Sequence, residues 1–162
     1  MSSNFQTIKP ERSYWVSKKF GCNFPNAERR PDAYPTYSAP FIFLDNGNPR
    51  CEIAQFGLVS HWATDKKKFG LKTYNARSET AHKKPSYRKA WRERRFSLVL
   101  FESFYEPCYD TSKAVSWRLM RPDAEPTAIA SIWERCVDKE TDEVIFSFSM
   151  LTINTYGHEA FP

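Results

Sequence analysis

The stretch Phe41-Ile42-Phe43-Leu44-Asp45-Asn46-Gly47-Asn48 predicts a β-hairpin and sets the class of fold. Four apolar residues lead into a polar turn that contains Asn-Gly, the dipeptide that best accepts the positive φ angles of a tight hairpin turn. Cys51-Glu52-Ile53-Ala54-Gln55-Phe56 supplies the returning strand. The chain therefore contains antiparallel β-structure in its first half.

Further strands are predicted on the C-terminal side of this hairpin. Residues 96–101 form a continuous apolar run of strand length, and residues 144–151 alternate apolar and polar side chains over their middle part. Residues 115–121 and 127–133 are two more strand candidates, and the acidic residues 138–143 predict a turn. The sequence thus favours five or six strands.

Two helices are predicted between and before these strands. Residues 9–20 begin with Pro10 in the first turn and end before Gly21, as helices commonly do. In residues 85–95 an apolar face combines Tyr87, Ala90 and Trp91. The proline-rich segment 25–40 and the lysine-rich segment 64–71 are predicted to be irregular loops.

These elements predict an α+β fold in a single domain over residues 1–162. We expect a strongly bent, mostly antiparallel sheet or an open β-barrel with a few flanking helices. The chain is 41% hydrophobic and 16% aromatic, so rings must fill much of the core or line a binding surface. No apolar run approaches the ~18 residues of a membrane span. No secretory signal is visible at the N-terminus, so we expect an intracellular, cytoplasmic protein that does not bind membranes.

The basic charge of the chain is concentrated in one segment. Residues 66–95 hold 12 Lys and Arg against 2 Asp and Glu, whereas the rest of the chain holds 12 against 17. Such segregation is typical of a protein that binds a polyanion, although a solvated helix face would give the same pattern. The four cysteines lack the close spacing of zinc ligands, so we expect free thiols, no metal and no cofactor.

The segment Thr73-Tyr74-Asn75-Ala76-Arg77-Ser78-Glu79-Thr80 is polar and carries no apolar stripe of helix or strand period. It is therefore either a solvated loop or a site. An apolar stretch ending in His61-Trp62 precedes it, and a basic stretch with interleaved aromatic residues, Lys83 to Arg92, follows it.

The order of these motifs resembles the SOS-response-associated peptidase family. The matching motifs are Phe56-Gly57-Leu58-Val59 with His61-Trp62, Asn75-Ala76-Arg77-Ser78-Glu79-Thr80, Lys84-Pro85-Ser86-Tyr87-Arg88 and Phe104-Tyr105-Glu106. The resemblance runs from about residue 34 to the end of the chain. It implies the same kind of fold and a protein that senses abasic sites in single-stranded DNA, in the DNA damage response.

The resemblance also implies a set of catalytic positions. In most family members residue 2 is a cysteine whose amine and thiol close a thiazolidine on the abasic sugar. Here the position holds Ser2, so the amine remains and the thiol is missing. Asn75 matches the asparagine beside this residue, and Glu106 matches the glutamate that moves protons. As alternatives, Ser2 is merely small, Asn75 stabilises a turn, and Glu106 forms a salt bridge.

DNA contacts are implied as well. Arg77 matches an arginine that binds phosphate, and pairing with Glu79 is its alternative role. Trp62 is a candidate for stacking on a base or, alternatively, a core residue. Arg88 and Arg92 lie off the apolar face of their helix and are expected to bind phosphate. The catalytic histidine of the family is expected beyond the last residue present.

Three functions remain open from the sequence: a covalent abasic-site sensor, a non-catalytic single-stranded-DNA-binding module, or a thiol-type (auto)peptidase. For the first, crosslinking, lyase or autopeptidase activity would be impaired by Ser2 and by the missing histidine. We expect a monomer that associates with the nucleoid when bound to DNA. The chain ends just after an apolar strand, so we expect that its C-terminal part is missing.

Overall fold

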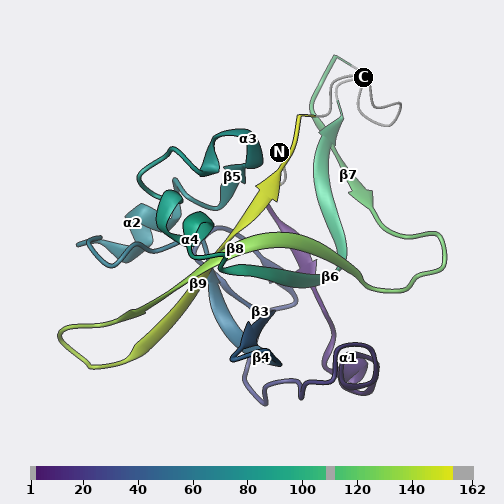
Figure 1. Ribbon diagram of the computed structural model, residues 1–162. Helices are drawn as coiled ribbons and strands as arrows, with labels where there is room; N and C mark the ends of the chain where they lie inside the picture. The colour runs from purple at the N-terminus through teal and green to yellow at the C-terminus, as the bar shows by residue number, and fades with distance from the viewer. Residues whose placement is uncertain (1–2, 109–111, 155–162) are drawn as a thin grey trace.

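The computed structural model of the chain describes residues 3–108 and 112–154, and within them nine strands form one curved sheet (Figure 1). The strands are β1 (Phe5–Thr7), β2 (Asp32–Ala33), β3 (Ser38–Asp45), β4 (Asn48–Phe56), β5 (Asn75–Arg77), β6 (Phe96–Cys108), β7 (Val115–Leu119), β8 (Thr127–Val137) and β9 (Val144–Thr152). The helical elements are η1 (Pro10–Arg12), α1 (Ser13–Phe20), α2 (Lys66–Gly70), α3 (Ser78–Ala81) and α4 (Arg88–Arg92).

Five strands close on themselves to form a barrel. β6 pairs with β3 and β8, β3 pairs with β4, and β8 pairs with β9, all antiparallel. The parallel pairing of β4 with β9 completes the circuit. This confirms the predicted α+β class with a strongly bent, mostly antiparallel sheet. The β3–β4 hairpin turns through Asn46 (φ 50°) and Gly47 (φ 82°), as the Asn-Gly dipeptide predicts.

Aromatic rings fill the barrel. The ring of Phe56 stacks on Phe148 at 5.3 Å between centroids and meets Phe5 edge-on, also at 5.3 Å. Phe41 stacks on Phe43 at 4.9 Å. Each buried phenylalanine contributes about 1.5–3 kcal/mol to the free energy of unfolding, so these rings account for the high aromatic content.

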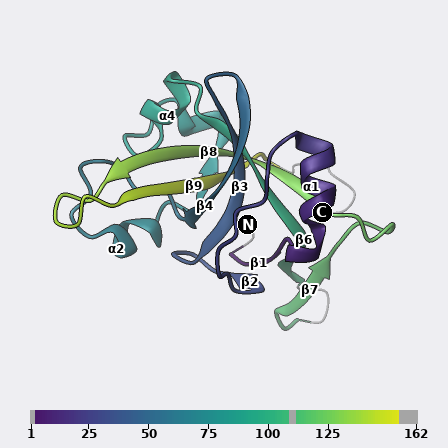
Figure 2. The ribbon, with the colours of Figure 1, turned by 90° about the horizontal axis from the view of Figure 1, so that it is seen from below.

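Short helices cover two outer faces of the barrel, on opposite sides in Figures 1 and 2. On one side Val16 of α1 packs in a cluster with Ile42 and Leu100. On the other side Ala81 of α3 and Ala90 of α4 pack against Ile132 of β8. The predicted helix start at Pro10 and stop at Gly21 (φ 70°) are both observed.

Several predicted boundaries were wrong. The segment expected as a loop over residues 25–40 contains β2 and the start of β3. The lysine-rich segment 64–71 contains α2, because the Asp65 carboxylate caps it by accepting from the Lys68 N–H at 3.0 Å. The helix expected over 85–95 is only α4, because Arg94 takes a left-handed φ of 54°.

The strand count was also underestimated. The three-residue β1 and the two-residue β2 are too short to leave a periodic pattern. β6 continues to Cys108 rather than ending at residue 101, because its last part pairs with β7. Among the described residues, no helix is long and apolar enough to cross a membrane.

Candidate nucleic-acid interface

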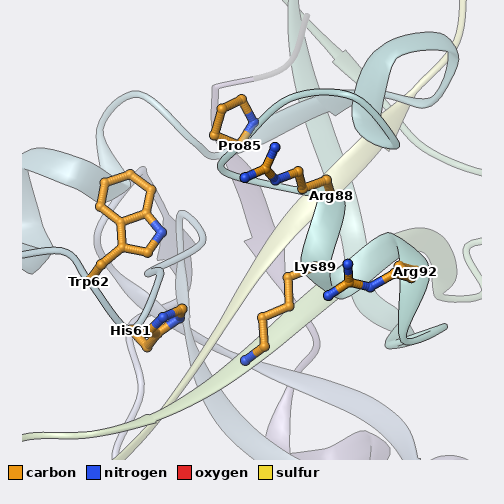
Figure 3. A pocket seen from close by; sticks show the side chains of 6 residues that line it. All are labelled: His61, Trp62, Pro85, Arg88, Lys89 and Arg92. Atoms are coloured by element: carbon orange, nitrogen blue, oxygen red, sulfur yellow. The ribbon is translucent and has the colours of Figure 1, made fainter.

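A groove of about 460 Å³ lies between the loop after β4 and the segment that carries α4 (Figure 3). Its lining residues are His61, Trp62, Pro85, Arg88, Lys89 and Arg92. Figure 3 shows the aromatic rings of His61 and Trp62 on one wall, and the Arg88 and Arg92 guanidinium groups on the other wall point toward them. The groove therefore combines a flat aromatic surface with three permanent cations.

Trp62 is a surface residue, so the alternative of a core tryptophan was wrong. Its side chain is 53% exposed, and its ring meets the Phe69 ring at 4.9 Å and 90° between planes. Phe69 belongs to α2, so the helix that sequence analysis missed supports the tryptophan. A supported but exposed indole can stack on a nucleobase.

The packing of α4 determines which of its side chains reach the groove. Tyr87 and Ala90 are buried against the barrel, and Trp91 packs beside them, as their spacing predicts. The Tyr87 hydroxyl donates to the Asn75 carbonyl at 3.0 Å, which ties this segment to β5. Arg88 and Arg92 are therefore exposed, in agreement with the prediction that they lie off the apolar face.

A buried carboxylate lies behind the cationic wall. Glu134 is 4% exposed, and its Oε2 contacts Arg95 Nη1 at 2.7 Å and Lys89 Nζ at 3.7 Å. Burial raises the pKa of Glu134, and the two cations oppose this rise. Because Lys89 is partly neutralised by this pair, Arg88 and Arg92 are the stronger candidates for phosphate contacts.

The polar segment 73–80 is neither a free loop nor part of the groove lining. β5 runs parallel to β9, with Asn75 opposite Met150 and Arg77 opposite Thr152. Asn75 is half-buried, whereas Arg77 is exposed where β5 meets α3. Pairing with β9 therefore holds β5 in the sheet, although the segment has no apolar stripe.

Glu106 lies within β6 rather than after a strand end. It is half-buried and sits opposite Trp117 of β7, whose side chain is 52% exposed. One residue earlier, the Tyr105 N–H donates to the Asn4 carbonyl at 3.2 Å. β6 thus runs beside the start of the chain at the position of Glu106.

A family model described as SOS response associated peptidase (SRAP) matches residues 6–159. The chain belongs to the SRAP family. The abasic site processing protein YoaM of Bacillus subtilis is 30% identical over 115 residues, which are 69% of this chain and 50% of that protein. The abasic site processing protein YoqW of the same organism is 32% identical over 114 residues, which are 68% of this chain and 50% of that protein. The chain thus matches these SRAP relatives over about half of their length.

Solved structures support the fold. A crystal structure of a protein from Bordetella bronchiseptica has a TM-score of 0.84 and 30% identity, covering 98% of this chain and 75% of that one. A second, from Bacteroides thetaiotaomicron, has a TM-score of 0.76 and 18% identity, covering 94% of this chain and 68% of that one. At this lower identity the second match shows the fold alone.

The structure thus brings together some of the residues predicted from the sequence to bind DNA. Trp62, Arg88 and Arg92 share the groove, whereas Asn75, Arg77 and Glu106 are not among its lining residues. Ser2 lies outside the described residues.

Sequence analysis missed three lining residues of the groove. His61 was given no binding role, but it is exposed and lines the groove beside Trp62. Sequence analysis gave Pro85 and Lys89 no binding role either, although Lys89 is next to Arg88 in the basic stretch.

The described residues contain no group of three His, Cys, Asp or Glu side chains arranged to hold a metal ion. The cysteines are free thiols, and Cys22, Cys51 and Cys136 are buried. Burial raises the pKa of the Cys51 thiol to about 12. This thiol is therefore protonated at neutral pH and a poor nucleophile.

Proposed function

We propose that this SRAP chain binds single-stranded DNA that contains abasic sites and forms a covalent adduct with them through residue 2. The observation that carries the proposal is the groove, where Trp62 faces the arginines of α4. Single-stranded DNA is held by such pairs of features, because an aromatic face accepts a base of any sequence and the cations bind the backbone. The names of the Bacillus subtilis relatives supply the abasic site as the specific substrate.

The position of β1 supports the chemical part of the proposal. Phe5 pairs with Phe104, two residues before Glu106. The Tyr105 N–H, one residue before Glu106, also donates to the Asn4 carbonyl at 3.2 Å. The described start of the chain therefore lies beside the strand that carries Glu106, as the proposed chemistry requires.

The reaction needs an amine, an aldehyde and a proton carrier. An α-amino group has a pKa of about 7.7–8.0, so a useful fraction is neutral near pH 7. The neutral nitrogen adds to the C1′ aldehyde of the opened sugar, and loss of water leaves a Schiff base. Glu106 moves the protons in this step, and the amide of Asn75 holds the amine or a sugar hydroxyl without adding charge. Since Ser2 has no thiol, we expect the adduct to remain a hydrolysable imine or a labile oxazolidine.

The test is an adduct assay on abasic and intact single strands, with and without borohydride. The chain should give an adduct that borohydride traps, because reduction of the imine yields a stable amine. Little of it should survive denaturation without reduction. Ser2→Cys should give a crosslink that survives denaturation without reduction, whereas the matched control Ser3→Cys should not. A heat-stable adduct from the serine form, or no adduct from either form when the C-terminal segment is supplied, would show that residue 2 is not the nucleophile.

A second function is favoured by one specific observation, the serine at the position of the family cysteine. It is a non-catalytic module that binds single-stranded DNA through the same groove. Tight binding to abasic and intact strands alike, with no trappable adduct, would support this alternative. For either function, we propose the cytoplasm, on or near the nucleoid, as the place of action.

A further inference from the structure

The side chain of Arg118 in β7 joins three strands. Its Nε donates to Ser103 Oγ of β6 at 2.9 Å, and its Nη2 donates to Gln6 Oε1 of β1 at 2.7 Å. Ser103 Oγ in turn donates to the same Gln6 oxygen at 3.2 Å. Two nitrogens of one rigid guanidinium plane are thus bonded to two strands at once, an arrangement that a flexible ammonium cannot reproduce.

β1 is also held by backbone pairing on both edges, by the buried Phe5 ring, and by Thr7, whose Oγ1 donates to the Arg30 carbonyl at 2.8 Å. It is three residues long, and its register with β6 shifts between Gln6 and Thr7. On its other edge it pairs only with the two-residue β2. The exposed Arg118 adds a side-chain link between Gln6 and β7, next to the direct bond from Ser103 to Gln6.

The same part of β7 also positions the proposed proton carrier. Arg118 is the register partner of Tyr105, and the adjacent Trp117 is the register partner of Glu106. Directly opposite residues of an antiparallel pair share a face, and successive residues alternate, so Arg118 and Glu106 lie on opposite faces of the ribbon. Arg118 thus ties β1 to β6, the strand that carries Glu106. It does so on the face of the ribbon opposite to Glu106.

We propose that Arg118 is a positioning residue that fixes β1, the strand that follows residue 2, relative to the strand that carries Glu106. This rests on the proposed function for its chemical consequence. Arg118 holds the described start of the chain beside the strand that carries Glu106. It does so through Gln6 and Ser103, without contact with the DNA.

The experiment compares the full chain with Arg118→Met, Gln6→Met and the double variant. The saturating rate of borohydride-trapped adduct formation should fall about 10–100-fold in Arg118→Met, because small misplacements of reacting groups cost that much. The DNA concentration at half-saturation should not change. The double variant should be no slower than the slower single variant, since both remove the same link. Arg118→Lys should recover part of the rate, and Arg121→Met, which removes an exposed arginine three residues on, should match the parent chain.

A second readout, amide hydrogen exchange in the DNA-free protein, does not depend on the chemistry. Exchange at Gln6 and at Tyr105, whose N–H binds the Asn4 carbonyl, should quicken in Arg118→Met relative to the barrel strands. If the parent chain forms no adduct, the proposed function fails, and the exchange result alone decides whether Arg118 holds β1.

Three outcomes would overturn the proposal. Unchanged exchange at β1 would show that Arg118 restrains nothing there. A raised half-saturation concentration with a shallower salt dependence would make Arg118 a phosphate contact instead. Rate losses that add fully in the double variant would show that the two side chains act separately.

Discussion

Removing the two exposed arginines of the groove tests the proposed interface most directly. The change is the double variant Arg88→Ala, Arg92→Ala. The groove presents three cationic side chains, and Glu134 already pairs with Lys89 at 3.7 Å. The two arginines should therefore carry most of the phosphate contacts.

The expected magnitude follows from counterion release. If each of the three cations neutralises one phosphate of a single strand, log K should fall with log salt at a slope of about −2.1. The double variant keeps only Lys89, so its slope should be about −0.7. Between about 50 and about 200 mM salt, the parent should lose about 18-fold in affinity and the variant only about 3-fold.

The assay is fluorescence anisotropy of a labelled single strand with one abasic site, titrated at four or more salt concentrations. The matched control is Arg50→Ala, Arg121→Ala, which removes the same formal charge. Arg50 is exposed at the β3–β4 hairpin and paired with Asp45 and Glu52, and Arg121 is exposed and paired with Asp123. The control should keep the slope of the parent. Equal slopes for both double variants would refute the groove, because net charge alone would then explain the binding.

Three further outcomes are expected. Trp62→Ala should weaken single-strand binding by about 1–3 kcal/mol in the same titration. The urea midpoint of unfolding should change little, because Trp62 is half exposed. Unaltered affinity would contradict stacking. Glu106→Gln in a Ser2→Cys background should slow adduct formation by about 10²-fold at unchanged affinity, whereas a loss of folding would identify a structural salt bridge. The hydrogen bond from Lys66 Nζ lowers the pKa of Asp138 to about 2. The stabilisation by this carboxylate is complete above its unfolded-state pKa of about 3.9 and is lost as the pH falls toward about 2. Asp138→Asn should therefore weaken the pH dependence of the unfolding free energy in that window. Urea unfolding at several acidic pH values measures this dependence, and an unchanged profile would contradict the prediction.

The sequence by itself determined the elements whose patterns are local. The Asn-Gly turn, the apolar runs and the Tyr87–Ala90 face depend on residues a few positions apart, so they could be read directly. The family motifs also lie in short contiguous stretches, which made the SRAP membership visible. The position of the basic segment was equally plain, because charge is a property of composition.

Only the tertiary structure decided how these elements meet. The barrel closes through a parallel pairing of β4 with β9, two strands separated by about half the chain, and no local pattern encodes a partner so distant. β5 has no apolar stripe because β9 holds it through backbone hydrogen bonds, so its polar sequence concealed a strand. His61 became a groove residue only when α4 packed across from it. Arg118 binds Gln6, 112 residues away, because β6 brings β7 and β1 to its two edges. Contacts of this kind join residues that are far apart in the sequence. Which residues meet depends on how the strands pair in space, and no periodic pattern in the sequence specifies it.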